Sequence, residues 1–393
     1  MNQPLFIQDF SFHSVLGHDK AQVFDKLVKG ERGNFTTLVH GEDRFYVSNI
    51  DTTDFPAPEN PYYNERINRL AEISLRDIEK SVQEAIAKYG ADRIGTFIGS
   101  CDNGSEISIN ALRHLKQHGK FPAGYRLDQQ KADFPLEYIM SRFGVRGPCA
   151  LQSTACGSSA TAIATARHSI YRGDCDAAII GGVDIASLAV VLGFNSLGAV
   201  SATPTNPFSK NRTGITLGDA SAFFLVTKEP LNAKFKITGI GESADADHIT
   251  APRADGEGAR LAMAKALDDA CLKPSDIDYI NLHGTGTRLN DSMEGIAIHK
   301  VFGDGVPCSS TQALTGHTLG AAGALELGFS CLVLSDMNPE GLLPAHLYDG
   351  EFDPEIPAIT LVRPGDRRKG IRRIQSNSFA FGGCNVSIIV EKV

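Results

Sequence analysis

Runs of apolar residues alternate along the chain with stretches in which apolar residues recur at helical spacing. The apolar runs predict β-strands at 93–100, 175–184, 220–229, 235–244 and 277–284. Several of these runs have no polar face, which is typical of parallel strands covered on both sides by helices. The segment 256–278 shows the clearest helical period, and its "KPSD" sequence is expected to end the helix before the next strand. This alternation predicts an α/β protein.

Two parts of the chain resemble each other in the order of their elements. In the first part, a predicted strand leads into the small-residue segment 150–170; in the second, another strand leads into the segment 306–334. Each part has a chemically reactive type of residue, Cys156 or His317, just before a helix rich in small residues. The repeat predicts two related α/β layers whose equivalent helix starts converge on one site.

Composition and charge narrow the classes of partner. The chain has 393 residues, 42% of them apolar, and a net charge of -8 without any run of Lys and Arg. We therefore expect neither nucleic acid nor an anionic membrane as the main partner. The first residues lack the pattern of a signal peptide, and no apolar run is long enough for a membrane span, so we expect a cytoplasmic protein. The eight cysteines show neither the spacing of a zinc site nor that of a disulfide framework.

The stretch "QSTACGSSATAIATARHSIYRG" at 152–173 places Cys156 where a short strand turns into a helix. Free backbone amides and the dipole at a helix start favour the thiolate, which is the nucleophilic form of cysteine. The same amides could hold an oxyanion. The small residues that follow allow the helix to pack closely, and Gly173 is expected to end it. The alternative is a buried cysteine that serves only packing.

Three further motifs add candidate groups to Cys156. His283 comes at the end of a predicted strand in "NLHGTGTRLNDSMEG", and His317 lies between glycines in "ALTGHTLGAAGALE". Either histidine alone would more often be structural, but a thiol with two imidazoles suits acyl transfer through a thioester. In "NSFAFGGCN" at 377–385, Phe381 precedes two glycines that permit unusual backbone turns, so its amide or ring could serve the site.

Four motifs of the chain together resemble the signature of the β-ketoacyl-acyl carrier protein synthases, the Cys-His-His condensing enzymes of the thiolase superfamily. In chain order they are "STACGSS", "HGTGTRLNDSMEG", "TGHTLGAAG" and "NSFAFGG". The resemblance implies a thiolase-like fold with two pseudo-symmetric halves, 1–234 with the nucleophilic cysteine and 235–393 with both histidines, in five layers ordered α-β-α-β-α. It also implies a reaction that uses no metal and no dissociable cofactor.

The resemblance assigns a role to each motif residue. Cys156 would take an acyl group from a carrier-protein thioester, and the amides of Cys156 and Phe381 would form the oxyanion hole. His283 and His317 would assist decarboxylation of a malonyl thioester, so that the acyl chain grows by two carbons. Thr285 and Thr287 match positions that bind the phosphopantetheine arm, and Phe381 also matches a residue that gates the acyl pocket.

Several positions depart from the family pattern. Gln312 stands where the family has a lysine, five residues before the second histidine. The resemblance pairs that lysine with a glutamate matched to Glu294, so a buried carboxylate would here face a neutral amide unless Arg212 or Arg288 reaches it. By the resemblance, Asp102 falls at a position facing the acyl pocket near the dimer interface, where it either points away or is contacted by the partner subunit, or else indicates a short, polar or aromatic acyl group. The remaining departures are Ala380 in place of a glycine, Thr213 and Ile215.

These departures favour a specialised synthase, such as one for polyketide or polyene assembly, over the general fatty-acid enzyme. The expected partners are an acyl carrier protein and a second subunit, either a copy of this chain or a related chain-length subunit. Two alternatives remain. A thiolase would carry a second catalytic cysteine in a Cys-x-Gly motif, whereas Cys384 is followed by Asn385. A non-catalytic ketosynthase-like subunit that docks acyl carrier protein would usually lack Cys156.

Overall fold

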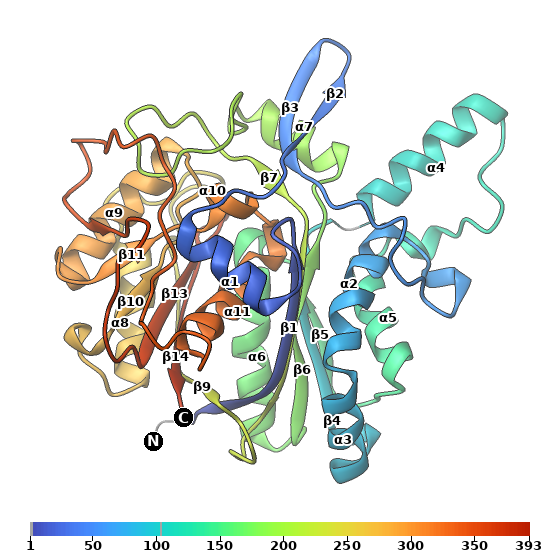
Figure 1. Ribbon diagram of the computed structural model, residues 1–393. Helices are drawn as coiled ribbons and strands as arrows, with labels where there is room; N and C mark the ends of the chain where they lie inside the picture. The colour runs from blue at the N-terminus through green and yellow to red at the C-terminus, as the bar shows by residue number, and fades with distance from the viewer. Residues whose placement is uncertain (1–2, 103) are drawn as a thin grey trace.

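A sheet of eleven strands organises the computed structural model, which describes residues 3–102 and 104–393 (Figure 1). The strands follow the order β12 (Thr360–Leu361), β11 (Pro307–Ser309), β10 (Tyr279–Asn281), β13 (Arg373–Phe379), β14 (Cys384–Lys392), β9 (Phe235–Ala244), β1 (Leu5–Ser14), β8 (Ala220–Thr227), β6 (Ala177–Asp184), β4 (Ile94–Gly99) and β5 (Cys149–Gln152). The two sides join where Leu5–Ile7 of β1 pair with Phe235–Ile237 of β9. The division expected at residues 234 and 235 falls just before β9; that the two sides are separate domains stays a prediction.

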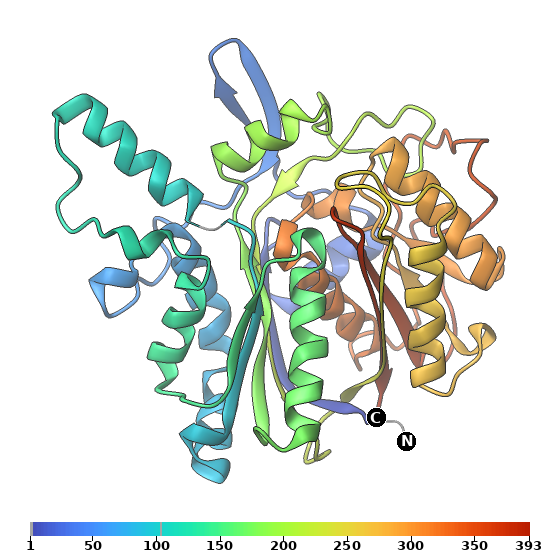
Figure 2. The same cartoon turned by 180° about the vertical axis from the view of Figure 1, so that it is seen from behind.

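Helices cover both sheet halves and fill the space between them (Figure 2). One outer layer holds α2 (Arg66–Asp77), α3 (Glu79–Tyr89) and α5 (Phe134–Phe143), and the other holds α8 (Glu257–Asp269) and α9 (Arg288–Phe302). The central layer contains α6 (Ser158–Arg172) and α11 (Ala322–Leu334), with α1 (Lys20–Lys29) beside α11. The five layers predicted from the family resemblance are confirmed.

Strand direction was only partly predictable. β4 pairs in parallel with β5 and β6, and β10 pairs in parallel with β11 and β13, as the apolar runs predicted. Two other runs expected to be strands, β8 and β9, have only antiparallel neighbours in the sheet. Both strands are nevertheless apolar along most of their length because helices cover the two faces, and burial does not depend on strand direction.

The two central helices approach each other through small residues. The backbone N–H of Ala324 in α11 donates to Ser159 Oγ in α6 at 3.0 Å. A Cβ added at Gly323 would lie 3.1 Å from the Cβ of Ala160, so a larger side chain would push the helices apart. Helix α6 ends as predicted at Gly173, whose φ of 82° places it in the left-handed region. The helix starts of the two halves therefore meet at the centre of the molecule.

Two segments project from this body (Figure 1). One is α4 (Ser105–His118), and the other is the hairpin of β2 (Thr36–His40) and β3 (Asp43–Ser48), where β3 also pairs with β7 (Leu217–Gly218). Helix α7 (Leu188–Ser196) contacts α4 near the base of this projection. Within the described residues, no helix combines the length and apolar character that a membrane crossing requires.

Candidate active site

Cys156 lies in a tight turn, η4 (Ala155–Gly157), that connects β5 to α6. The residue before it, Ala155, has a φ of 50°, a conformation that costs energy for a residue with a side chain and is common at functional sites. Gly99 at the end of β4 allows the turn to sit close to the sheet, because a Cβ there would lie 2.2 Å from the backbone N of Ser159. The turn thus holds Cys156 rigidly at the start of a buried helix, with only 5% of the residue exposed.

His317 occupies the corresponding connection of the second half, between α10 (Gln312–Thr315) and η6 (Leu319–Ala321). Its backbone N–H donates to the carbonyl of Thr216 at 2.6 Å, and its own carbonyl accepts from the N–H of Gly218 at 2.9 Å. Leu319 has a φ of 56°, which repeats the unusual backbone of Ala155 just before the second central helix. This matched geometry supports the internal repeat predicted from the sequence.

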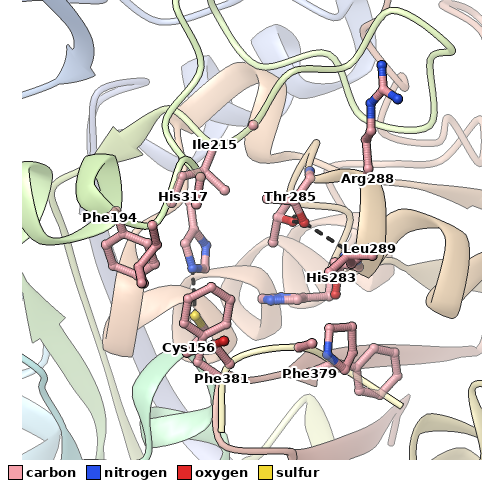
Figure 3. A pocket seen from close by; sticks show the side chains of 18 of the residues that line it. Cys156, Phe194, Ile215, His283, Thr285, Arg288, Leu289, His317, Phe379 and Phe381 are labelled. Carbon is pink, nitrogen blue, oxygen red and sulfur yellow. Dashed lines mark hydrogen bonds between the residues drawn. The ribbon is translucent and has the colours of Figure 1, made fainter. Parts of the chain in front are cut away.

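Cys156, His283 and His317 come together at the floor of a cavity (Figure 3). His317 Nε2 lies 2.8 Å from Cys156 Sγ. The centroids of the His283 and His317 rings are 5.3 Å apart, and the ring planes make an angle of 79°. The sulfur and one nitrogen from each ring all lie within 4.8 Å of one another. The convergence expected from three separate motifs is therefore present.

Burial controls the charge of all three groups. It raises the pKa of Cys156 to about 12, although hydrogen bonding from the backbone of Phe381 and of Cys156 itself opposes the rise. Burial lowers the pKa of His317 to about 4 and, together with the nearby His317, holds the pKa of His283 well below its usual value. The expectation that the helix start would leave Cys156 as a thiolate was wrong, because desolvation outweighs the helix dipole at this buried position. A neutral thiol faces two neutral imidazoles.

His283 is positioned from the backbone by Glu294. The two oxygens of this buried carboxyl accept from the backbone N–H groups of His283 and Gly284, at 2.8 and 2.7 Å. Burial raises the pKa of Glu294 to about 8. Arg212 does not reach it and instead donates to Asp353 at 2.5 Å. Glu294 therefore supports the histidine loop, and it is not among the residues that line the cavity.

The carboxyl that faces Gln312 is Glu326, so the expected partnership with Glu294 was wrong. Gln312 Nε2 lies 3.3 Å from Glu326 Oε1 and 3.5 Å from His283 Nδ1. All three side chains are buried, and burial raises the pKa of Glu326 well above its usual value. Sequence reasoning missed Glu326, although an acid inside the apolar helix "AGALELGFSCLVL" was a visible signal.

Two cavities meet at Cys156. The larger one, about 490 Å³, is lined by both histidines and by Thr285 and Thr287, whose hydroxyls lie 3.0 Å apart. The smaller one, about 350 Å³, is lined mostly by apolar residues, and Cys156, Phe194, Leu197 and Phe381 border both spaces. The rings of Phe194 and Phe381 are 5.4 Å apart and lie between the cavities. The site can thus receive two separate groups on either side of the thiol.

Asp102 follows the first of its two expected readings and points away from the acyl pocket. It is 2% exposed and lines neither cavity; its Oδ1 accepts from Ser105 Oγ at 2.5 Å. The neighbouring Cys101 borders the smaller cavity instead. Sequence reasoning also missed Asp184, at the end of β6, which accepts backbone N–H groups from Cys101, Asp102 and Gly320 at 2.7–2.9 Å. Asp184 therefore ties together the turns of the two halves beneath the site.

Known proteins are similar to this chain in sequence and in overall structure. A solved ketosynthase in complex with its chain length factor, from Xenorhabdus doucetiae, matches with 37% identity and a TM-score of 0.91, over 100% of this chain and 98% of that one. A 3-oxoacyl-acyl carrier protein synthase 2 from Staphylococcus aureus is 30% identical over 418 residues, which cover 100% of this chain and 99% of that protein. A mitochondrial 3-oxoacyl-acyl carrier protein synthase from Arabidopsis thaliana is 35% identical over 346 residues, 82% of this chain and 73% of that protein.

Two family models also match. The β-ketoacyl synthase N-terminal domain covers residues 58–231, and the β-ketoacyl synthase C-terminal domain covers residues 235–344. These matches span most of the chain and include the turns that carry Cys156, His283 and His317. The chain belongs to the β-ketoacyl synthase family.

Proposed function

We propose that this protein is a β-ketoacyl-acyl carrier protein synthase, which condenses an acyl group held on Cys156 with a malonyl thioester. The observation that carries this proposal is the buried 2.8 Å contact between Cys156 Sγ and His317 Nε2, with a ring nitrogen of His283 within 4.8 Å of both. A thiol, two imidazoles and nearby backbone N–H groups are the parts that acyl transfer needs.

In the first step, Cys156 takes the acyl group. His317 Nε2 accepts the thiol proton as the sulfur attacks the carbonyl carbon of the acyl thioester. The backbone N–H groups of Cys156 and Phe381, which already act on the sulfur, stabilise the oxygen as it becomes negative. The intermediate then collapses, the carbon–sulfur bond to the carrier breaks, and the proton passes to the departing carrier sulfur.

In the second step, the two imidazoles stabilise an enolate; His317 Nδ1 has no hydrogen-bond partner, so once Cys156 is acylated the ring proton of His317 can reside on Nε2. The malonyl thioester loses carbon dioxide, and the electron pair of the broken carbon–carbon bond passes into the thioester, whose oxygen becomes negative. Gln312 Nε2 faces His283 Nδ1, and an N–H donor at that position leaves the proton of a neutral imidazole on Nε2. His283 can then donate to the enolate oxygen. The enolate carbon attacks the acyl carbonyl, the carbon–sulfur bond to Cys156 breaks, the sulfur takes up one proton from solvent, and the product carries two more carbons.

The cavities assign places to the two substrates. The larger cavity, with Thr285 and Thr287 on its wall, would hold the phosphopantetheine arm of an acyl carrier protein, and the smaller apolar cavity would hold the acyl chain. Gln312 would act on this reaction through His283, because it does not line either cavity. Asp102 has no place in substrate binding under this proposal.

We further propose that the enzyme works with a second subunit, either a copy of itself or a chain-length subunit. The smaller cavity is incompletely enclosed by this chain, because Gly193 and Leu197 on its wall are exposed. The nearby projection adds exposed apolar residues Leu112, Phe121 and Leu127. The similar chain from Xenorhabdus doucetiae was solved with a chain length factor, which supports specialised assembly of a polyketide or polyene. We place this activity in the cytoplasm, where free thiols such as the eight found here persist.

Intact-protein mass spectrometry after mixing with a panel of acyl carrier protein thioesters tests the proposal. We expect an acyl adduct on the wild-type chain, alone or with a candidate partner subunit, that disappears in Cys156→Ala. The variant Cys149→Ala removes an exposed thiol instead and should keep the adduct. If no thioester loads Cys156 under any condition, the chain is a non-catalytic ketosynthase-like subunit that docks acyl carrier protein.

A further inference from the structure

The same three groups that suit acyl transfer also form a potential metal site. Within residues 3–102 and 104–393, Cys156, His283 and His317 are the only group of three or more Cys, His, Asp or Glu side chains arranged closely enough to share an ion. The ligand atoms come from separate turns, with 161 positions between Cys156 and His317, so sequence spacing did not indicate a metal site. We propose that this group binds Zn²⁺ reversibly when Cys156 is unacylated, and that the bound ion prevents acylation.

The ligand types and their geometry favour zinc. One thiolate and two imidazoles, with a fourth position open to water, are ligands that Zn²⁺ accepts. Zn–S and Zn–N bonds of about 2.3 and 2.0 Å at a tetrahedral angle place the sulfur and nitrogen about 3.5 Å apart. The Cys156 to His317 contact of 2.8 Å would open slightly, and the remaining separations, all within 4.8 Å, differ from the required values by little more than about 1 Å at most. These are side-chain adjustments at the floor of a cavity that is large enough to admit a hydrated ion.

Binding is balanced by the release of one proton. Zn²⁺ forms bonds to Cys156 Sγ, His317 Nε2 and His283, the thiol proton leaves to solvent, and water completes the fourth position. No electron is transferred. A sulfur that shares one electron pair with zinc is a weaker nucleophile, His317 Nε2 can no longer accept a proton, and the ion occupies the space between the thiol and the imidazoles. Acylation and zinc binding are therefore mutually exclusive.

Gln312 makes this site suited to metal in a way that a cationic side chain would not. Because His283 Nδ1 faces Gln312, Nε2 is the nitrogen available to the ion, and Nδ1 must then carry the proton. The buried Oε1 of Gln312 has no hydrogen-bond partner, and rotation of the amide would present it to that N–H. A lysine here could only donate, and its charge would oppose the ion. The same rotation turns the Gln312 oxygen toward the buried Glu326, whose protonated carboxyl can donate a hydrogen bond to it.

Protection of Cys156 from iodoacetamide tests the site without any condensation assay. The chain carries Cys149→Ser and Cys271→Ser to remove two exposed thiols, and peptide mass mapping follows alkylation at Cys156. With micromolar Zn²⁺ we expect the alkylation rate to fall at least tenfold and to recover on addition of a chelator. His283→Ala and His317→Ala should lose this protection, and Gln312→Lys should raise the zinc concentration needed at least tenfold, whereas the neutral Gln312→Met should raise it less.

Two results would overturn the inference. One is an alkylation rate that changes less than twofold at a hundredfold excess of Zn²⁺ over protein. The other is equal protection in the wild-type chain and in both histidine variants, which would place the ion elsewhere. Thermal unfolding of each variant without metal identifies any that fail to fold. Because alkylation needs no acyl substrate, the zinc site can be tested even if no thioester ever loads Cys156.

Discussion

His317 Nε2 lies 2.8 Å from the sulfur of Cys156, and the two residues are 1% and 5% exposed. The contact joins one half of the molecule to the other, because each residue stands in the turn before a central helix of its own half. Because the contact between Cys156 and His317 is buried away from water, burial determines how the thiol is activated. Proton transfer from Cys156 to His317 has to accompany attack on the substrate, since neither group is charged beforehand.

The pH dependence of Cys156 alkylation tests this neutral state. The pKa of Cys156 is raised to about 12, so the reactive thiolate fraction should grow about tenfold with each pH unit and show no plateau below pH 10. Peptide mass mapping separates Cys156 from the other thiols while the initial rate is measured from pH 6 to 10. A thiolate already paired with a charged His317 would instead give a rate that is flat across this range, and that outcome contradicts the neutral pair.

Gln312→Met should separate the two chemical steps. The variant keeps the volume of the side chain but cannot donate to His283 Nδ1, so the proton of His283 is no longer fixed on Nε2. We expect release of carbon dioxide from malonyl carrier protein to fall about tenfold, while acylation of Cys156 changes little. Both are measured on the same preparation, by carbon dioxide release and by intact mass.

The control for that experiment is Gln375→Met, which removes a buried amide bonded to Met263 and Ser387 away from the cavities. It should lower stability without changing the ratio of the two rates. If Gln312→Met lowers acylation and decarboxylation equally, Gln312 serves the site as a whole and does not act through His283.

The groups that reach the site through short motifs were predictable. Cys156, His283 and His317 each follow or precede a strongly patterned strand or helix, so their meeting at the ends of these elements could be expected from the sequence. Glu326 and Asp184 were missed because the role of each depends on a partner that is distant in the sequence. Glu326 faces the side chain of Gln312, and Asp184 accepts from the backbone N–H of Gly320. The local sequence around either acid does not indicate that partner. An isolated acid in an apolar run was the only signal for either.

The errors have a common physical origin. Asp102 was placed near the acyl pocket by the family resemblance, but adjacent residues of an extended segment point to opposite sides, so Cys101 borders the cavity and Asp102 does not. The thiolate was expected from the helix start, but the depth of burial is a property of the assembled layers. The direction of β8 and β9 could not be read from the sequence for the same reason, since coverage by helices makes parallel and antiparallel strands equally apolar.

Glu294→Gln should destabilise the protein and loosen the His283 loop. An amide replaces one of the two acceptor oxygens with an NH₂ group, which would then face a backbone N–H at His283 or Gly284. Leaving one buried donor unpaired costs about 1–3 kcal/mol of unfolding free energy, which denaturant titration can measure. Glu257→Gln, which breaks only a contact to Arg260 at the protein surface, with both side chains about one-third exposed, should change little.

The loss of unfolding free energy in Glu294→Gln should depend on pH, because the pKa of Glu294 is raised in the folded protein. Glu294 has a folded pKa of about 8, above its unfolded value, so its contribution to stability is full below the unfolded value and is lost as the pH rises through 8. The difference in unfolding free energy between wild type and Glu294→Gln should therefore narrow from pH 5 to pH 8. A difference that stays constant over this range would mean that Glu294 is already ionised in the folded protein.

Gly193 in α7 should set the length of acyl chain that the smaller cavity accepts. It lines that cavity, and no heavy atom lies within 4 Å of a Cβ added there, so a larger side chain has space to enter. We expect Gly193→Leu to reduce loading of long acyl thioesters onto Cys156 at least tenfold and to leave loading of acetyl thioester unchanged. A tenfold change is on the order of the discrimination that a few methylene groups produce in a hydrophobic pocket. Gly193→Ala should mainly stabilise the helix, by about 0.5–1 kcal/mol.

Asn195→Leu is the matched control for the chain-length prediction, because Asn195 is exposed on the same helix and lines neither cavity. Intact mass after a fixed time with acyl thioesters of increasing length gives a loading profile for each variant. The profile of Asn195→Leu should match that of the wild type, and the cut-off of Gly193→Leu should move to shorter chains. An unchanged cut-off in Gly193→Leu, with the protein folded, would place the acyl chain outside the smaller cavity, and the chain-length limit would then have to come from a surface that this subunit does not supply.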